Sequence, residues 1–166
     1  MVKILKLFFP FWIFLILFKF GGGLHYSLLA PLGQKVFPLW VVGLLIGASA
    51  FLQLLLDVPA GYLLDRYGYK KLLKITTFFF VIASALLLFG ITKPIFVLTL
   101  VVSAFAWLFF GPGVTAYTMS HASKDTLGKF ISSKDVFTSV GIVLSSIMVI
   151  FAVNFKTEFL GLILTA

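Results

Sequence analysis

The sequence predicts an all-α integral membrane protein, on the strength of its composition, the length of its apolar runs and the placement of its basic residues. Hydrophobic residues make up 61% of the 166 residues, and charged residues make up 11%. A soluble domain usually carries about a quarter charged residues, because its surface must face water. This chain has too few charges to cover such a surface, and a lipid bilayer is the solvent that tolerates its composition.

Five apolar runs are each long enough to cross a bilayer as a helix. About 20 apolar residues cover a hydrocarbon core of roughly 30 Å. A helix pairs its own backbone groups, whereas an unpaired amide in lipid costs several kcal/mol. The predicted spans are 7–31, 38–64, 72–92, 95–119 and 136–154.

A sixth apolar run opens at Phe159 and reaches Ala166. As a helix it rises only about 12 Å, which is too short to cross the hydrocarbon core. We therefore expect a truncated sixth span over 159–166, and we expect the chain to be a fragment of a longer protein.

The first run can also be compared with a signal peptide, because the basic start Met1–Lys6 is followed by an apolar stretch. No small-x-small cleavage site follows, and apolar residues continue to Ala30. An uncleaved first span is the better interpretation.

The basic residues indicate how the spans are oriented. Inner loops carry an excess of Lys and Arg. With the N-terminus inside, nine basic residues fall on inner segments, three fall on outer turns, and Lys19 lies within a span. We therefore expect a multi-pass protein of the cytoplasmic (inner) membrane with a cytoplasmic N-terminus.

The net charge of +8 does not indicate a nucleic-acid partner, because the basic residues form short clusters between apolar runs. The chain has no cysteine, which excludes disulfides and thiolate metal sites. Its two histidines, His25 and His121, lie far apart in the sequence. We expect no metal and no cofactor.

The most specific segment, Asp57–Leu72, joins the second and third predicted spans. Asp57, Gly61 and Asp65 recur every four residues and therefore share one face of a helix. Gly68 permits the positive φ of a tight turn. The alternative is an ordinary basic inner loop in which Gly and Asp are simply turn residues.

This segment resembles the signature loop of the major facilitator superfamily, which reads roughly G-x-L-a-D-r-x-G-r-k between helices two and three. Tyr69 departs from the pattern, since the family usually has Arg or Lys there. The resemblance implies the N-terminal six-helix bundle of a transporter, built as a 3+3 inverted repeat. It also implies that the loop is a latch between two transporter halves. The matching and flanking residues of this latch are Asp57, Gly61, Asp65, Arg66, Gly68, Lys70 and Lys71.

Internal similarity supports the repeat weakly, because membrane helices share a small alphabet. Residues 20–24 of the first span parallel 110–114 of the fourth, and residues 42–48 of the second parallel 140–146 of the fifth. Trp107 stands where many proton-coupled members of the family have Arg, which weakens an inference of proton coupling.

Lys19 is the strongest candidate for the translocation path, because it lies near the middle of the first span. A lone charge at that depth costs about 2.5–3.5 kcal/mol and usually faces a water-filled cavity. Trp12, Gly23 and Tyr26 share its stripe and are predicted to line the same path. The alternative is a lysine that snorkels to the interface from a misplaced helix boundary.

Two glycine-rich segments are predicted to bend or break their helices. Pro removes a backbone donor, and paired glycines reduce stiffness. Discontinuous helices often line transporter binding sites, and simple close packing is the alternative. The predicted hinge residues are Gly21, Gly22, Gly111, Pro112 and Gly113.

The resemblance implies a secondary active transporter that moves a small solute across the cytoplasmic membrane by alternating access. Its expected partners are the lipid bilayer, an unknown small-molecule substrate and a missing C-terminal helical bundle, in cis or in trans. The alternative is a non-transporting scaffold or a degenerate transporter remnant. A lipid-processing membrane enzyme is disfavoured, because the five acidic residues show no catalytic spacing, and we expect no enzymatic activity.

Overall fold

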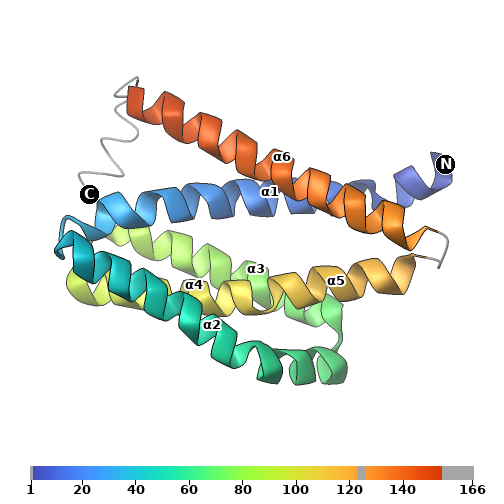
Figure 1. Cartoon of the computed structure of the whole chain (residues 1–166), viewed down its shortest axis with the longest axis horizontal. Helices are drawn as coiled ribbons and strands as arrows, with labels where there is room; N and C mark the ends of the chain where they lie inside the picture. The colour runs from blue at the N-terminus through green and yellow to red at the C-terminus, as the bar shows by residue number, and fades with distance from the viewer. Residues whose placement is uncertain (1, 123–125, 155–166) are drawn as a thin grey trace. The chain divides into compact units, whose positions relative to one another are not determined.

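The computed structural model describes the backbone of residues 2–122 and 126–154, and the side chains of residues 9–122 and 126–151. Every regular element in this part of the chain is a helix, which confirms the all-α class (Figure 1). In order these are α1 (Val2–Gly33), α2 (Leu39–Tyr67), α3 (Tyr69–Leu86), the 3-10 helix η1 (Leu87–Phe89), α4 (Lys93–Leu108), α5 (Phe110–His121) and α6 (Leu127–Asn154).

Five helical stretches of the described chain are long and apolar enough to cross a membrane, as the sequence predicted. They are Phe9–Gly33, Leu39–Tyr67, Tyr69–Phe89, Lys93–His121 and Leu127–Phe151. The α4 and α5 helices together form the fourth stretch. The sixth predicted run, 159–166, lies outside the described residues.

The fifth stretch begins earlier than the sequence boundary at residue 136. Its helix α6 starts at Leu127 and includes Lys129, Lys134 and Asp135. The prediction excluded these residues because they are charged. A helix can extend past the apolar core as long as its charged side chains reach water, so hydropathy marks the membrane boundary better than the helix boundary.

The chain forms two compact units, which are described separately. One contains residues 2–28 of α1 together with α6, and the other contains residues 29–121. In the second unit, α3 and α2 both pack chiefly against α4, and α5 continues the packing along α3. The central position of α4 explains why it contributes the largest share of buried residues.

Two apolar clusters form the core of the second unit. The first contains Leu29, Val42, Phe96 and Leu100, and the second contains Ala60, Leu72, Leu108 and Phe109. Phe96 is fully buried. Its ring fits against Gly33, where a side chain would collide with it. A glycine at the end of α1 therefore lets the large Phe96 ring fill the first cluster.

The helix boundaries of the second unit have local causes. Thr92 precedes α4, and its hydroxyl accepts a hydrogen bond from the Ile95 N–H at 3.4 Å. Pro94 stands in the first turn of α4, where its missing N–H is not needed. Gly90, with φ of 87°, ends the 3-10 helix η1. Each boundary thus follows from one or two residues of the local sequence.

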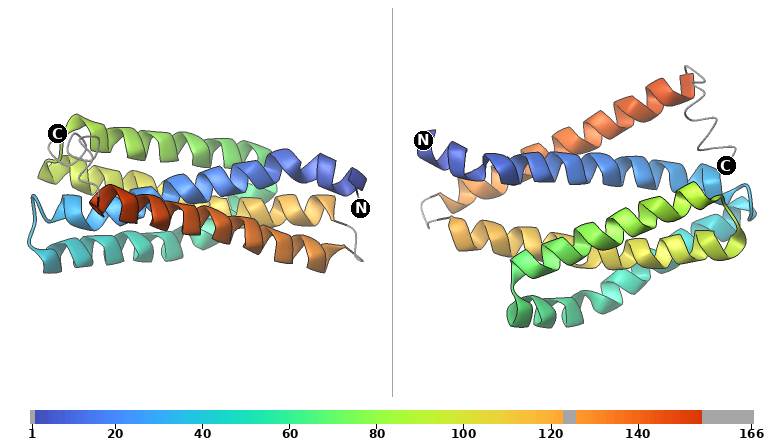
Figure 2. Two further views of the ribbon diagram at one scale, coloured as in Figure 1. Left: turned by 90° about the horizontal axis from the view of Figure 1, so that it is seen from above. Right: turned by 180° about the vertical axis from the view of Figure 1, so that it is seen from behind.

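In the first unit, α1 and α6 approach closely at two small residues, and Figure 2 shows the two helices from further sides. Gly141 is buried, and a Cβ there would lie 2.6 Å from the Ile16 carbonyl oxygen and 2.8 Å from the Lys19 Cβ. A Cβ at Gly23 would likewise collide with the Ser145 side chain. Small residues at such points let two membrane helices pack backbone against backbone.

Candidate functional site

A single residue, Gly68, joins α2 to α3. Its φ is 77° and its ψ is 153°. Its N–H donates to the Leu64 carbonyl oxygen at 2.9 Å, and its own carbonyl accepts from the Leu72 N–H at 3.4 Å. Side chains rarely adopt such a φ. Glycine is therefore the residue type that permits this direct reversal between two long helices.

The predicted latch residues surround this turn and are mostly exposed. Asp65, Arg66, Lys70 and Lys71 all face the surface of the unit. The Arg66 guanidinium lies 5.4 Å and the Lys71 Nζ 4.7 Å from the centre of the Tyr67 ring. Cations over an exposed ring gain about 0.5–1 kcal/mol each. Two of the positive charges of the turn therefore lie close to the Tyr67 ring.

The two carboxylates of the segment differ from these cations in having no partner among the described residues. Asp57 and Asp65 are both exposed, and neither forms an ion pair within the described part of the chain. Gly61 lies between them on α2, and a Cβ there would meet nothing within 4 Å. This face of α2 is open to a further element.

Tyr69, the departure from the family pattern, forms an aromatic cluster with the end of α5. Its ring meets the Tyr117 ring edge-on at 5.5 Å and the His121 ring at 6.0 Å. Tyr117 and His121 stack at 4.4 Å. The cluster fixes the start of α3 against the end of α5. Sequence reasoning missed it, because only the four-residue spacing of Tyr117 and His121 is visible locally.

A hydrogen bond orients the histidine of this cluster. The His121 Nδ1 lies 2.9 Å from the Tyr117 carbonyl oxygen and 2.8 Å from the Ser120 hydroxyl. A carbonyl oxygen only accepts, so the first contact places a proton on Nδ1. The ring is thereby held against Tyr117 from within its own helix.

The residues predicted to line the translocation path on α1 differ in their exposure and in their contacts. Trp12 is only 6% exposed and stacks on Phe137 of α6 at 4.8 Å. Gly23 also faces α6, against Ser145. Tyr26, by contrast, is 37% exposed. Trp12 and Gly23 thus pack against α6 in this structure, and the role in translocation predicted for Lys19, Trp12, Gly23 and Tyr26 stays a prediction.

The two predicted hinge segments also differ. The α1 helix continues without a break through Gly21 and Gly22, and a hinge at these residues stays a prediction. The fourth span, in contrast, is interrupted at Phe109, between α4 and α5. Pro112 has no N–H to donate to the Leu108 carbonyl four residues earlier, which accounts for the interruption. Whether Gly111, Pro112 and Gly113 act as a hinge in motion stays a prediction.

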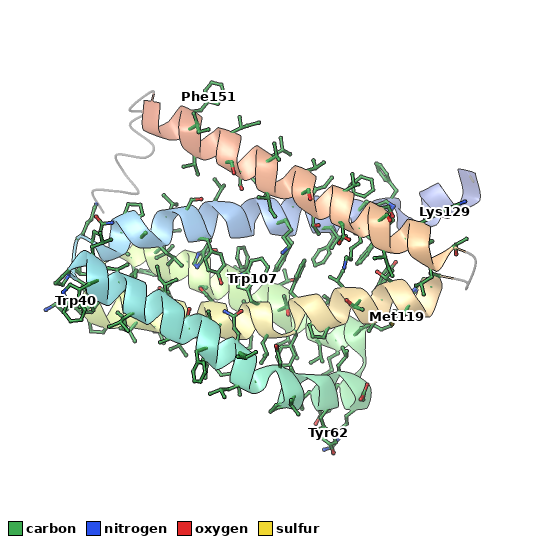
Figure 3. All side chains as sticks on the ribbon, in the orientation of Figure 1. Trp40, Tyr62, Trp107, Met119, Lys129 and Phe151 are labelled. Carbon is green, nitrogen blue, oxygen red and sulfur yellow. The ribbon has the colours of Figure 1, made fainter. Side chains whose placement is uncertain are left out.

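An open groove of about 610 Å³ lies between α2 and the junction of α4 with α5. It is lined by Ala50, Gln53, Leu54, Asp57, Trp107, Leu108, Gly111 and Pro112. Figure 3 labels Trp107 on α4. That Gln53 and Trp107 share a surface was not predictable from the sequence, because they are far apart in the chain.

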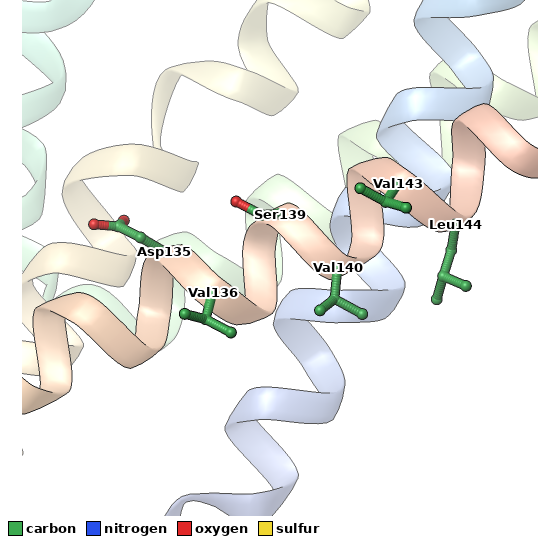
Figure 4. Close-up of a pocket in the computed structure, with 6 residues that line it drawn as sticks. All are labelled: Asp135, Val136, Ser139, Val140, Val143 and Leu144. Carbon is green, nitrogen blue, oxygen red and sulfur yellow. The ribbon is translucent and has the colours of Figure 1, made fainter.

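A second hollow, of about 490 Å³, lies along α6 (Figure 4). Its lining is almost wholly apolar, with Asp135 at one end, and consists of Asp135, Val136, Ser139, Val140, Val143 and Leu144. The Asp135 carboxylate pairs with the neighbouring Lys134 Nζ at 3.4 Å. The described residues contain no group of three His, Cys, Asp or Glu that could hold a metal ion.

Fold and site together define a multi-pass α-helical membrane protein with a charged, glycine-centred turn between its second and third spans. Residues 40–166 match the sequence model of the Major Facilitator Superfamily, and the chain belongs to that family. This confirms the resemblance of the Asp57–Leu72 segment.

Two similar relatives are MFS-type transporters from two strains of Mycobacterium tuberculosis. Each is 29% identical to this chain over 136 residues, which cover 81% of this chain and 32% of the relative. The chain thus spans about a third of the length of the curated relatives it matches. No solved structure shows a significant match.

Proposed function

We propose that the chain forms most of the N-terminal helical half of a secondary active transporter, which moves a small solute across the cytoplasmic membrane by alternating access. Membership of a transporter family supports transport rather than enzymatic catalysis. The observation that carries the proposal is the turn at Gly68, where the signature residues of the family join two apolar helices through one glycine of positive φ.

The charges around this turn suit a latch. Asp65 lies three residues before Gly68, is exposed, and forms no ion pair within the described residues. Arg66, Lys70 and Lys71 are exposed beside it. These groups are available to a second helical bundle, in cis or in trans. Ion pairs that form in one access state and break in the other would bias the equilibrium between the two states.

The remaining elements have proposed roles in the same cycle. The translocation path would include Lys19 of α1 together with Trp12, Gly23 and Tyr26. The interruption at Phe109, with the adjacent Gly111–Gly113, would let the two parts of the fourth span move separately. The N-terminus and the Gly68 turn would face the cytoplasm, as the distribution of basic residues indicates.

Transport is tested on the complete protein that contains this chain. A thermal-shift screen of small solutes identifies a ligand, and uptake of that ligand into proteoliposomes measures flux. We expect Asp65→Asn to slow flux, because the loss of its carboxylate would remove any ion pair that biases the equilibrium between the access states. Asp135→Asn on α6 is the matched loss of a carboxylate and should leave flux within about twofold of wild type. Absence of flux for every stabilising solute would refute the transporter and favour a scaffold.

Orientation is tested separately. The chain has no cysteine, so a single introduced thiol reports one position. In intact cells, a membrane-impermeant maleimide should label Lys93→Cys and spare Lys70→Cys. The reverse pattern would show that the Gly68 turn faces outward, and the latch proposal would fall.

A further inference from the structure

The groove between α2 and the α4–α5 junction has two walls of different character. On α2, Ala50, Gln53, Leu54 and Asp57 follow the spacing of one helix face. The opposite wall spans the interruption of the fourth span, from Trp107 to Pro112. All of these residues belong to the same compact unit, so the groove is a feature of that unit alone.

The polar groups of the groove are mainly acceptors. Asp57 contributes an exposed carboxylate that forms no ion pair among the described residues. The Gln53 side chain, one turn earlier, contributes an amide oxygen as well as a donor. Pro112 gives no N–H to the Leu108 carbonyl, so that backbone acceptor lacks its usual helical partner. Among the residues that the structure describes, no Lys, Arg or His lines the groove.

The helix ends in the opposite wall do not change the negative electrostatic potential that the acceptor groups give the groove. The C-terminus of α4 carries a partial negative charge and the N-terminus of α5 a partial positive charge. Only Phe109 separates these two ends. Their opposite partial charges largely offset each other at that distance, so the Asp57 carboxylate decides the potential of the groove.

The groove also presents apolar and aromatic surface. The Leu54 side chain is 65% exposed, and the Trp107 indole lies across from it in the groove lining. The Trp107 ring meets Phe110 at 5.4 Å and Phe80 at 6.4 Å, both edge-on. These contacts fix the indole in place. Trp is the side chain that attracts cations most strongly through its ring face.

Asp57, which is predicted as a flanking residue of the latch, lies farther from the turn than Asp65 does. It lies eight residues before Asp65, which is about 12 Å along the helix axis. That places Asp57 within the apolar part of the second span, where an acidic residue is costly and usually marks a ligand or ion site. Asp65 lies beside the turn that carries Arg66, Lys70 and Lys71. The two carboxylates therefore meet different surroundings.

We propose that this groove binds a hydrophobic organic cation, with its positive charge at Asp57 and its apolar groups against Leu54 and Trp107. The identification of this cation as a transported substrate rests on the proposed function, whereas its binding to the groove does not. An anion of the same shape would meet the Asp57 carboxylate and bind poorly.

The test uses the 166-residue chain in lipid nanodiscs and tetraphenylphosphonium as the probe. Equilibrium dialysis measures binding, and empty nanodiscs give the contribution of lipid partitioning. We expect saturable binding that Asp57→Asn weakens at least tenfold and Asp57→Glu largely retains. Asp135→Asn, which removes a carboxylate from α6, should stay within twofold of wild type. Tetraphenylborate, which has the same shape and the opposite charge, should show no saturable binding.

Equal affinities of wild type and Asp57→Asn for tetraphenylphosphonium would overturn the proposal, as would saturable binding of tetraphenylborate. Circular dichroism of each variant confirms that the helices are retained, and binding by Asp57→Glu shows that the site itself is intact. In the complete protein, cation binding without flux would refute the proposed transport function and support the groove as a binding site. Cation flux that is unchanged in Asp57→Asn would refute the groove as the binding site and support the proposed transport function.

Discussion

Adding one methyl group at Gly141 should loosen the contact between α1 and α6. The Cβ of Gly141→Ala would lie 2.6 Å from the Ile16 carbonyl oxygen, 2.8 Å from the Lys19 Cβ and 3.1 Å from the Phe20 N. Two of the three nearest atoms belong to the backbone of α1, so a rotamer change cannot relieve the contact. The helices must separate by several tenths of an ångström, and neighbouring contacts such as Gly23 with Ser145 loosen with them.

The expected loss follows from the energetics of overpacking. Extra methylenes in a packed interior typically cost about 1–3 kcal/mol. Replacing Gly by Ala inside a helix gains about 0.5–1 kcal/mol from backbone entropy, which would mask part of this loss. Gly43→Ala on α2 gains the same amount, and its Cβ meets nothing within 4 Å. The difference between the two variants therefore isolates the steric term.

Thermal unfolding of the 166-residue chain in detergent, followed by circular dichroism, measures this difference. For a chain of this size, 1 kcal/mol shifts the midpoint by about 2–4 °C. We expect Gly141→Ala to unfold roughly 2–12 °C below Gly43→Ala. Equal midpoints would refute the close approach of α1 and α6 at Gly141. A lower midpoint for Gly43→Ala would show that α2 is covered in the isolated chain.

Three further features are tested by the same unfolding measurement or by amide exchange. Gly23→Ala should destabilise the chain, and Ser145→Gly in the same chain should restore stability; a double variant no more stable than Gly23→Ala would exclude their contact. Gly68→Ala should cost about 1–3 kcal/mol, because glycine is essentially the only residue that adopts a φ of 77° with a ψ of 153°. An Ala variant as stable as wild type would contradict the turn. Pro112→Ala supplies a donor to the Leu108 carbonyl and should slow amide exchange around it, with a gain of up to about 3 kcal/mol; unchanged exchange would show that proline does not cause the break.

Features that depend on neighbouring residues were predictable from the sequence. The α2–α3 turn is one, because Gly68 and the helix-forming residues on both sides act within a few residues. The interruption of the fourth span is another, because the missing N–H of Pro112 is a covalent fact that acts four residues away. The five apolar spans followed equally directly from their length.

Features that depend on which helices pack together were not predictable. The sequence could not distinguish a flexible Gly21–Gly23 segment from a packed one, since glycine permits both. The structure shows a continuous helix there, with Gly23 against Ser145. The contact of Trp12 with Phe137 and the cluster of Tyr69 with Tyr117 join residues distant in the chain, and no local spacing encodes them.

The exposed glycines of α2 bear on where a second bundle would sit. Only 6% of the most apolar window of α2 is buried, against 50% for the span that contains α4 and α5. Gly43, Gly47 and Gly61 all lie on α2 with open space where a Cβ would stand. Glycine offers lipid tails less apolar contact area than a larger side chain would. It does, however, let a second helix approach α2 closely.

The face of α6 shown in Figure 4 differs from α2 in this respect. It presents bulky residues, including Val136, Val140 and Val143, which suit lipid tails or a more distant neighbour. If the chain is half of a transporter, as proposed, α2 is therefore the helix on which the other half should pack most closely. Bulky substitutions at Gly43 and Gly47 would then be tolerated in the isolated chain and would impair the complete protein.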